Sequence, residues 1–361
     1  MTLPRNGEAT RLASIDTASQ HGPRPLPLFL ALLRAETAAS PERRAAALAG
    51  LAAYQQAPRP TPPTPPPVVA SAGRARLLGF GGNGPPLLLV PSLINPPAIL
   101  ALGEQHGFAG WLATQGFRPL LLDWGSPAPG EAALSVAGHV ETLLLPLIDA
   151  LGEPPLVAGY CLGGTMALAA AMLRPLRALA LIAAPFRFTG FGDAARADIA
   201  ALWARAEPPA KAMGLVPMEV LQTGFWRLDP GRTIGKYEAF GRLDPASAAA
   251  RNFIAVEDWA NAGAPLTYAA GHELMTDFVA ADRPGSGGWA VGGRVVDPAA
   301  LACPAIEVIS TSDRIVPAAS AVGLPERISL GAGHVGMVVG GRARQQLWQP
   351  LAAWLSRAAS A

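Results

Sequence analysis

The sequence predicts an α/β protein, with a mostly parallel sheet that helices cover on both faces. Two observations favour this class. Beyond residue 67, short apolar runs without in-and-out alternation are separated by longer helical stretches, a pattern typical of strands buried on both faces. One of these runs leads into a glycine-flanked cysteine, Cys161, which opens a helical stretch. The chain of 361 residues, 50% of them hydrophobic, is long enough for one large core.

Residues 1–66 are predicted to form an N-terminal helical extension. Residues 1–25 are polar and contain prolines, and we expect them to be mobile. Helices are predicted over residues 26–37, which carry an apolar stripe, and over residues 41–56, where Ser40 and Pro41 are a typical helix start. Seven prolines between Ala57 and Pro67 predict a semi-rigid spacer that ends the extension.

Residues 67–361 are predicted to form the second, larger domain. Its strands are expected at residues 76–79, 86–91, 118–123, 156–160, 178–183, 305–310 and 327–330. Its main helices are expected at residues 97–115, 131–151, 162–173 and 342–359. The alternation of strands and helices stops over residues 188–303, which hold Trp203, Trp226, Trp259 and Trp289. We expect this segment to be a cap inserted over the carboxyl edge of the sheet.

Composition argues against several classes of protein. A net charge of +2 with no Lys/Arg block gives no electrostatic footprint for nucleic acid. Two cysteines, Cys161 and Cys303, exclude a disulfide scaffold and a multi-thiolate metal site. No apolar signal segment opens the chain and no uninterrupted run of 18 apolar residues occurs, so we expect a cytoplasmic protein without a transmembrane segment.

The sequence also predicts no cofactor and no metal. His21, His106, His139 and His272 show no ligand spacing with one another or with carboxylates. The glycine-rich residues 79–84 precede a strand rather than a helix, so we interpret them as a hairpin turn and not as a phosphate-binding loop.

The motif that carries chemistry is Gly159-Tyr160-Cys161-Leu162-Gly163-Gly164. It follows an apolar run and opens an apolar helix, the pattern of the nucleophile elbow G-x-S-x-G with Cys in place of Ser. The tight strand-to-helix turn needs small residues two positions before and after the nucleophile. The helix amino terminus then favours a thiolate and a developing oxyanion. A nucleophile elbow at this place predicts the α/β-hydrolase fold. The alternative for Cys161 is a buried structural cysteine whose glycine neighbours serve helix–strand packing.

A nucleophilic cysteine needs a base, and the base needs an orienting acid. In this fold the order along the chain is nucleophile, acid, histidine. Asp313 follows the predicted strand 305–310, and His334 follows the last predicted strand within a glycine-rich loop. We therefore expect Cys161, His334 and Asp313 to form the catalytic triad. The alternative for His334 is an ordinary surface-loop histidine.

The oxyanion hole is expected from two backbone amides. One is the N–H of Leu162, directly after the nucleophile. The other should come from the loop after the strand 86–91, where the N–H of Leu93 or of Ile94 is our candidate.

With these motifs the sequence resembles the polyhydroxyalkanoate synthases. The family's G-x-C-x-G-G box matches residues 159–164, and its Asp and His motifs match Asp313 and His334. The short, two-subunit (class III) branch is the most similar. Further similar stretches are residues 90–95, 123–127, 235–237, 257–259 and 293–297.

The resemblance implies a reaction. The substrate would be an (R)-3-hydroxyacyl-CoA, polymerised into polyhydroxyalkanoate through an acyl-enzyme on Cys161 with release of CoA. His334 would deprotonate Cys161 and then the acceptor hydroxyl, and Asp313 would hold the His334 tautomer. Trp259 and the cap would exclude water from the site. A second synthase subunit or a homodimer, and the surface of a polyester granule, are the implied partners.

Two other functions are compatible with the same residues. A Cys-type hydrolase, either an intracellular polyhydroxyalkanoate depolymerase or an acyl-CoA thioesterase, differs only in letting water reach the acyl-enzyme. A non-catalytic relative that binds a granule or a partner would use the apolar helix predicted at residues 26–37. The intact set of Cys161, Asp313 and His334 argues against the non-catalytic alternative.

Overall fold

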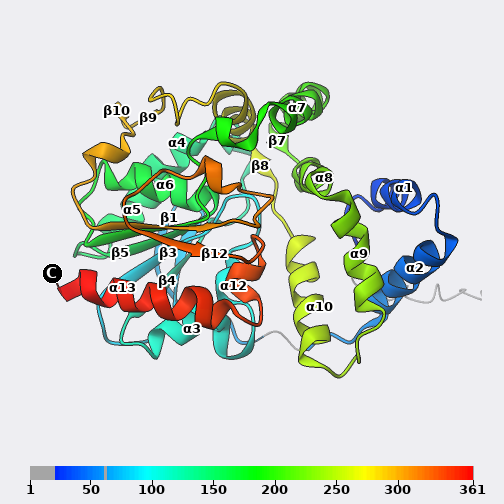
Figure 1. Cartoon of the computed structure of the whole chain (residues 1–361). Helices are drawn as coiled ribbons and strands as arrows, with labels where there is room; N and C mark the ends of the chain where they lie inside the picture. Colours follow the sequence, from blue (N-terminus) through cyan, green and yellow to red (C-terminus); the bar gives the residue numbers. More distant parts are fainter. Residues whose placement is uncertain (1–20, 61–62, 361) are drawn as a thin grey trace, which may run out of the picture.

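The computed structural model describes residues 21–60 and 63–360 (Figure 1). Most of residues 1–25, for which the sequence predicts mobility, lies outside the described residues. Within the described part of the chain, eight strands form one sheet in the order β1-β2-β4-β3-β5-β6-β11-β12. These strands are β1 (Val68–Ala72), β2 (Ala75–Gly79), β3 (Pro86–Val90), β4 (Arg118–Asp123), β5 (Leu156–Tyr160), β6 (Ala178–Ile182), β11 (Ala305–Ser310) and β12 (Arg327–Leu330).

Strand β2 runs against the direction of the rest of the sheet. It pairs antiparallel with β1 and with β4, whereas the pairs from β4 to β12 are all parallel. All five residues of β3, β5 and β6 are buried, because both faces of these central strands are covered. This sheet, with its crossover helices, is the α/β-hydrolase fold that the elbow motif predicts.

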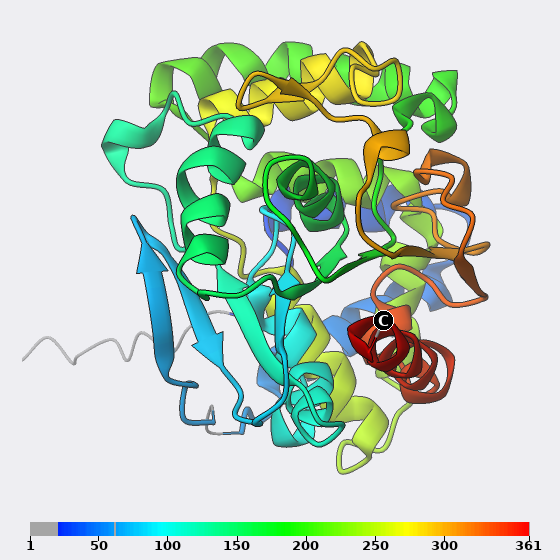
Figure 2. The ribbon, with the colours of Figure 1, turned by 90° about the vertical axis from the view of Figure 1, so that its left-hand side faces the viewer.

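Two hydrophobic cores lie on opposite faces of the sheet. Alternate residues of β3 divide between them, Leu88 and Val90 in one core, Leu87 and Leu89 in the other. The first core includes α5 (Leu145–Asp149) and α6 (Leu162–Ala171), and the second includes α3 (Gly107–Ala113) and α13 (Gln349–Ser360). Figures 1 and 2 show these helices as layers above and below the sheet.

The segment between β6 and β11 departs from the layered pattern. Its helices are α7 (Asp193–Met213), α8 (Met218–Leu228), α9 (Pro230–Phe240), α10 (Ala248–Ala260) and α11 (Tyr268–His272), the last continuing as a π-helix over Glu273–Ala280. Two-residue strands pair within it, β7 (Leu215–Val216) with β8 (Leu266–Thr267) and β9 (Ala290–Val291) with β10 (Arg294–Val295). In Figure 1 helices α8 to α10 stand beside the sheet, and α7 lies at the top of the view, above α8.

The two N-terminal helices pack against this inserted segment. They are α1 (Leu26–Glu36) and α2 (Pro41–Gln56), where Ser40 caps α2 by accepting the Arg43 N–H at 3.3 Å, as the sequence predicts. Phe29 and Tyr54 form a third core with Trp226 and Tyr237 of α8 and α9. The backbones touch at Gly50, where a Cβ atom would lie 1.9 Å from the carbonyl oxygen of Tyr237.

Three expectations about local structure were wrong. Residues 79–84 do not turn a hairpin, because β4 lies between β2 and β3; the hairpin is formed by β1 and β2, and β1 was not predicted. The helix expected over 97–115 is broken into 3₁₀ turns and α3, since Gly103 and Gly107 adopt φ values of 114° and 52°. The helix expected over 131–151 begins only at Val136, and a π-helical turn at Val140–Leu144 interrupts it.

Among the described helices, none is long and apolar enough to span a bilayer.

Candidate active site

Cys161 lies in the sharp turn between β5 and α6. Its backbone has φ 56° and ψ −134°, a conformation that side-chain-bearing residues rarely adopt, and its N–H donates to the carbonyl of Ile182 at 2.9 Å. The flanking glycines are required by contact: a Cβ on Gly159 would lie 2.5 Å from the Cα of Gly164, and one on Gly163 would lie 2.3 Å from the Val90 carbonyl oxygen. The turn therefore presents the thiol at the amino end of α6, at the carboxyl edge of the sheet.

His334 and Asp313 are brought together by the two strands that end beside them. The Nδ1 of His334, after β12, lies 2.6 Å from Oδ2 of Asp313, after β11. The other carboxylate oxygen, Oδ1, accepts the amides of Ile315 and Val316 at 2.8 and 3.0 Å. Both side chains are buried, at 7% and 0% exposure. Asp313 is therefore fixed in its loop, and it fixes the ring of His334.

The environment of His334 favours the imidazolium. Burial by itself lowers the pKa of His334, but the charge of Asp313 and a hydrogen bond and charge at Cys161 raise the pKa to about 10. Cys161 and His334 line the same cavity. An imidazolium beside a thiolate is the ion pair that activates a cysteine nucleophile.

Tyr160, the residue before Cys161, holds His334 from a second side. Its ring stacks on the imidazole with centroids 4.9 Å apart and an interplanar angle of 25°. Its hydroxyl donates to the backbone carbonyl of His334 at 3.2 Å. Burial raises the pKa of the Tyr160 phenol well above its usual value, so the hydroxyl stays a donor. No motif in the sequence marks Tyr160 as a partner of His334, since only the fold shows that it reaches the histidine loop.

The two expected oxyanion amides differ in their surroundings. The N–H of Ile94 is already engaged, because it donates to the Oγ of Ser92 at 3.2 Å. Leu162 is the first residue of α6, where helix geometry leaves its amide without an acceptor. Leu93 is buried in the loop after β3, and no backbone hydrogen bond of the described residues uses its N–H.

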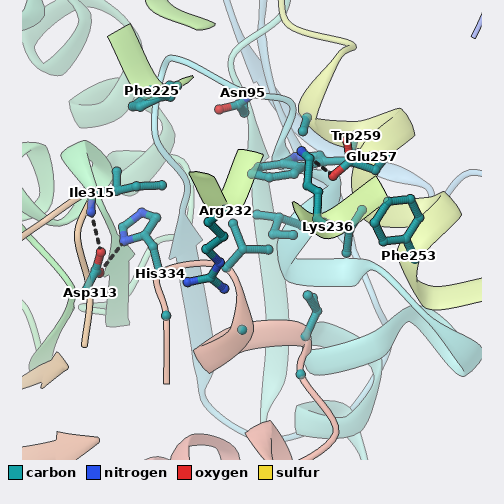
Figure 3. A pocket seen from close by; sticks show the side chains of 18 of the residues that line it. Asn95, Phe225, Arg232, Lys236, Phe253, Glu257, Trp259, Asp313, Ile315 and His334 are labelled. Atoms are coloured by element: carbon teal, nitrogen blue, oxygen red, sulfur yellow. Dashed lines mark hydrogen bonds and ion pairs between the residues drawn. The ribbon is translucent and has the colours of Figure 1, made fainter. Parts of the chain in front are cut away.

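A cavity of about 1110 Å³ opens above the thiol (Figure 3). Cys161, Asp313 and His334 line one side of it, and residues of α8, α9 and α10 line the other. The inserted segment thus covers the site. In Figure 3 His334 and Asp313 lie on one side, Lys236, Glu257 and Trp259 on the other, and Arg232 between them.

Trp259 joins the inserted segment to the loop after β3. Its indole N–H donates to the carbonyl oxygen of Pro96 at 2.8 Å, and its side chain, half-buried, lines the cavity. On the same helix, Glu257 accepts from Lys236 Nζ at 2.7 Å and from the Tyr237 hydroxyl at 2.8 Å. Two of the family-like stretches, 235–237 and 257–259, therefore meet at the cavity wall.

The described residues offer no cluster of three or more His, Cys, Asp or Glu side chains suited to a metal ion. His139 is buried between Arg74 and the Ser135 carbonyl, and His272 pairs with Glu207. Neither of these histidines lines the cavity at Cys161.

The sheet order and the buried elbow place the chain among α/β-hydrolase-fold proteins that carry a cysteine at the elbow. No protein-family model matches the sequence. Curated relatives do match, and each is a "Poly(3-hydroxyalkanoate) polymerase subunit PhaC". The match covers 75% of this chain in each case. The relative from Haloferax mediterranei is 26% identical, with 58% of its own length covered. The relatives from Synechocystis and Thiocystis violacea are 27% and 24% identical, with 77% and 80% of their own lengths covered.

The resemblance to the polyhydroxyalkanoate synthases is thereby confirmed. The chain spans less than two thirds of the Haloferax relative. Solved structures similar to it include an esterase of Thermogutta terrifontis, with 19% identity, a TM-score of 0.44, and coverage of 82% of this chain and 99% of that one. Another is a monoacylglycerol lipase of Paleococcus ferrophilus, with 13% identity, a TM-score of 0.45, and coverage of 78% and 99%.

Proposed function

We propose that this chain polymerises (R)-3-hydroxyacyl groups from their CoA thioesters, through an acyl-enzyme on Cys161. The observation that carries the proposal is one arrangement: a cysteine in a strained elbow, beside a buried imidazole–carboxylate pair, at the floor of a cavity of about 1110 Å³ that the inserted segment lines. The names of the curated relatives support the same reaction.

The first half-reaction is a thiol–thioester exchange. The Cys161 thiolate attacks the acyl carbonyl, and the oxyanion that develops accepts hydrogen bonds from the backbone N–H groups of Leu162 and Leu93. When the bond from the carbonyl carbon to the CoA sulfur breaks, His334 gives its proton to the departing thiolate. The acyl-enzyme is itself a thioester, so it stays reactive toward the next nucleophile.

The second half-reaction uses the same histidine in the opposite direction. Neutral His334 takes the proton of an acceptor 3-hydroxyl, whose oxygen attacks the acyl-enzyme. An ester bond forms, the bond to Cys161 Sγ breaks, and the thiolate–imidazolium pair is restored. Asp313 keeps the proton on Nδ1 throughout, so that Nε2 faces the reacting groups.

The inserted segment controls whether an acceptor hydroxyl or water reaches the acyl-enzyme. Phe225, Trp226 and Trp259 line the cavity opposite the thiol and give this wall apolar surface beside its charged groups. An apolar covered site favours a polyester hydroxyl over water. The hydrolase alternative uses an identical triad and predicts a different product.

The test follows both products of one reaction. Purified chain and 3-hydroxybutyryl-CoA are mixed, CoA release is followed with a thiol reagent, and the acyl product is identified by mass spectrometry. We expect CoA release with oligomeric ester, abolished in Cys161→Ala and retained in the control Cys303→Ala, because Cys303 is a half-buried thiol outside the cavity lining. Monomeric 3-hydroxybutyrate alone would identify a hydrolase, and no CoA release, even with a candidate partner subunit added, would refute the proposal.

The partners belong to the same proposal. A second subunit or second copy, and a granule surface, would adjoin an apolar part of the molecule. Leu26, Leu28 and Leu30 of α1 are 37–38% exposed and point away from the third core, which supports such a contact. Light scattering of the purified chain, with and without polymer particles, measures it.

A further inference from the structure

The charged groups of the cavity wall pair with one another, with one exception. Asp313 is paired with His334, Glu257 with Lys236 at 2.7 Å, and Asp229 with Arg314 at 3.6 Å. Each carboxylate of the described lining therefore has a cationic partner.

Arg232 is the cation left over. Among the described residues its guanidinium has no hydrogen-bond acceptor and no ion-pair partner; only its backbone N–H is engaged, by Asp229. The side chain lines the cavity and is exposed, so it stands at the opening and not in the floor.

The guanidinium nevertheless lies beside the loop that carries His334. It lies against Gly333, the residue before His334: a Cβ on Gly333 would be 3.1 Å from one terminal nitrogen of Arg232 and 3.2 Å from the other. Any larger residue at position 333 would crowd it. Both terminal nitrogens thus lie beside the histidine loop, on a residue that lines the cavity (Figure 3).

Helix stability does not account for this arginine. Arg232 is in the first turn of α9, whose N-cap is Asp229. A cation there is opposed by the positive end of the helix dipole. The same dipole adds to the attraction that the guanidinium exerts on an anion.

We propose that Arg232 binds an oxyanion of the substrate at the mouth of the cavity. A guanidinium suits a phosphate or a carboxylate, which it holds through two parallel hydrogen bonds. The inference rests on the proposed function for its substrate, and a CoA thioester supplies such an anion through its phosphates. The other source of the same chemistry is a carboxylate at the far end of the acyl group.

The test separates these sources by removing the phosphates from the ligand. Calorimetry on the Cys161→Ala background, in which no acyl transfer occurs, measures the binding of CoA and of pantetheine. The variants are Arg232→Gln, Arg232→Lys, and the control Arg227→Gln, since Arg227 is an exposed arginine outside the cavity lining. We expect Arg232→Gln to weaken CoA about tenfold, to leave pantetheine within about twofold, and to reduce the dependence of CoA binding on salt. Arg232→Lys should lie between, and Arg227→Gln should match the parent.

Turnover with phosphate-free thioesters gives the second arm. In the active chain, Arg232→Gln should raise the KM for 3-hydroxybutyryl-CoA and leave kcat and the KM for 3-hydroxybutyryl-pantetheine unchanged. If the variant instead affects only 3-hydroxyglutaryl-pantetheine, which carries a distal carboxylate, the oxyanion site stands and its ligand is the acyl carboxylate. Equal losses for CoA and pantetheine, or no loss for any anionic ligand, would overturn the proposal. Since binding is measured without turnover, an inactive chain whose CoA binding depends on Arg232 would refute the proposed function alone.

Discussion

The charge that keeps His334 protonated can be removed with little change of shape, by Asp313→Asn. The Oδ1 of Asp313 accepts two backbone amides, from Ile315 and Val316. An asparagine oxygen can retain both bonds, which turns its NH₂ group toward Nδ1 of His334. Nδ1 must then accept, so the ring proton moves to Nε2 and the histidine can no longer act as a base toward Cys161.

The size of the effect follows from the pKa of His334. Burial lowers this pKa and the charges of Asp313 and Cys161 raise it, from 6.5 to about 10. At about 1.36 kcal/mol per pH unit, this corresponds to roughly 5 kcal/mol in favour of the imidazolium. Asparagine removes the largest raising influence and leaves the burial, so the pKa of His334 in the variant should fall below 6.5.

The same pKa links stability to pH. Because the folded-state pKa of His334 is raised, its stabilising contribution is complete below pH 6.5 and is lost as the pH rises toward about 10. The free energy of unfolding of the parent in urea should therefore fall as the pH rises from 6.5 toward about 10. In Asp313→Asn this fall should be absent.

Three assays check these expectations. NMR titration of the imidazole signal, assigned with His334→Gln, reports the pKa. Alkylation of Cys161 by iodoacetamide in a Cys303→Ser background reports thiolate formation at pH 5–7. The value of kcat/KM should drop about 10⁴-fold, the cost of the wrong tautomer in comparable triads. An unchanged titration of His334, or an unchanged pH profile of alkylation, would show that Asp313 does not control the imidazole.

Four further substitutions test the elbow, the support of His334 and the cavity wall. Gly163→Ala places a Cβ against two backbone carbonyls and should lower the free energy of unfolding in urea by about 3 kcal/mol or more. The control Gly235→Ala lies mid-helix with nothing within 4 Å of the new Cβ and should raise it by about 0.5–1 kcal/mol. Equal effects of the two substitutions would contradict the contact argument. Tyr160→Phe removes the bond to the His334 carbonyl and should lower kcat while leaving the unfolding free energy within about 1.5 kcal/mol; an unchanged kcat would deny it a positioning role. Glu257→Gln leaves a lysine and a phenol without their carboxylate and should destabilise by about 2–4 kcal/mol; a loss below about 0.5 kcal/mol would refute that estimate.

The parallel strands were predictable because burial on both faces leaves an unbroken apolar run. β4, β5, β11 and β12 have the predicted bounds, and β3 and β6 end one residue earlier than expected. β1 escaped prediction because its residues are exposed or only partly buried, so no apolar signal marks it. The interruption of the helix expected over 97–115 depends on backbone angles that composition does not encode.

In the candidate site, too, some residues were predictable from the sequence and others were not. Cys161, Asp313 and His334 each follow a strand in a recognisable order, so motif and topology sufficed to nominate them. Arg232 lies on a helix of the inserted segment, whose position over the sheet depends on tertiary packing. No local pattern distinguishes it from a solvent-facing arginine, and its lack of a partner among the described residues is visible only in the folded chain.

The third core has a consequence for how the chain is made. Tyr54 and Asp258, whose side chains meet at 2.6 Å, are 204 residues apart in the sequence. At a synthesis rate of about 5–20 residues per second, roughly 10–40 s separate their emergence from the ribosome. During that interval Phe29, Leu33 and Tyr54, which are buried in the folded chain, have no partners from α8 to α10. Helices α1 and α2 are thus covered long after their own synthesis, and nascent chains stalled before α10 should be a target for holdase chaperones.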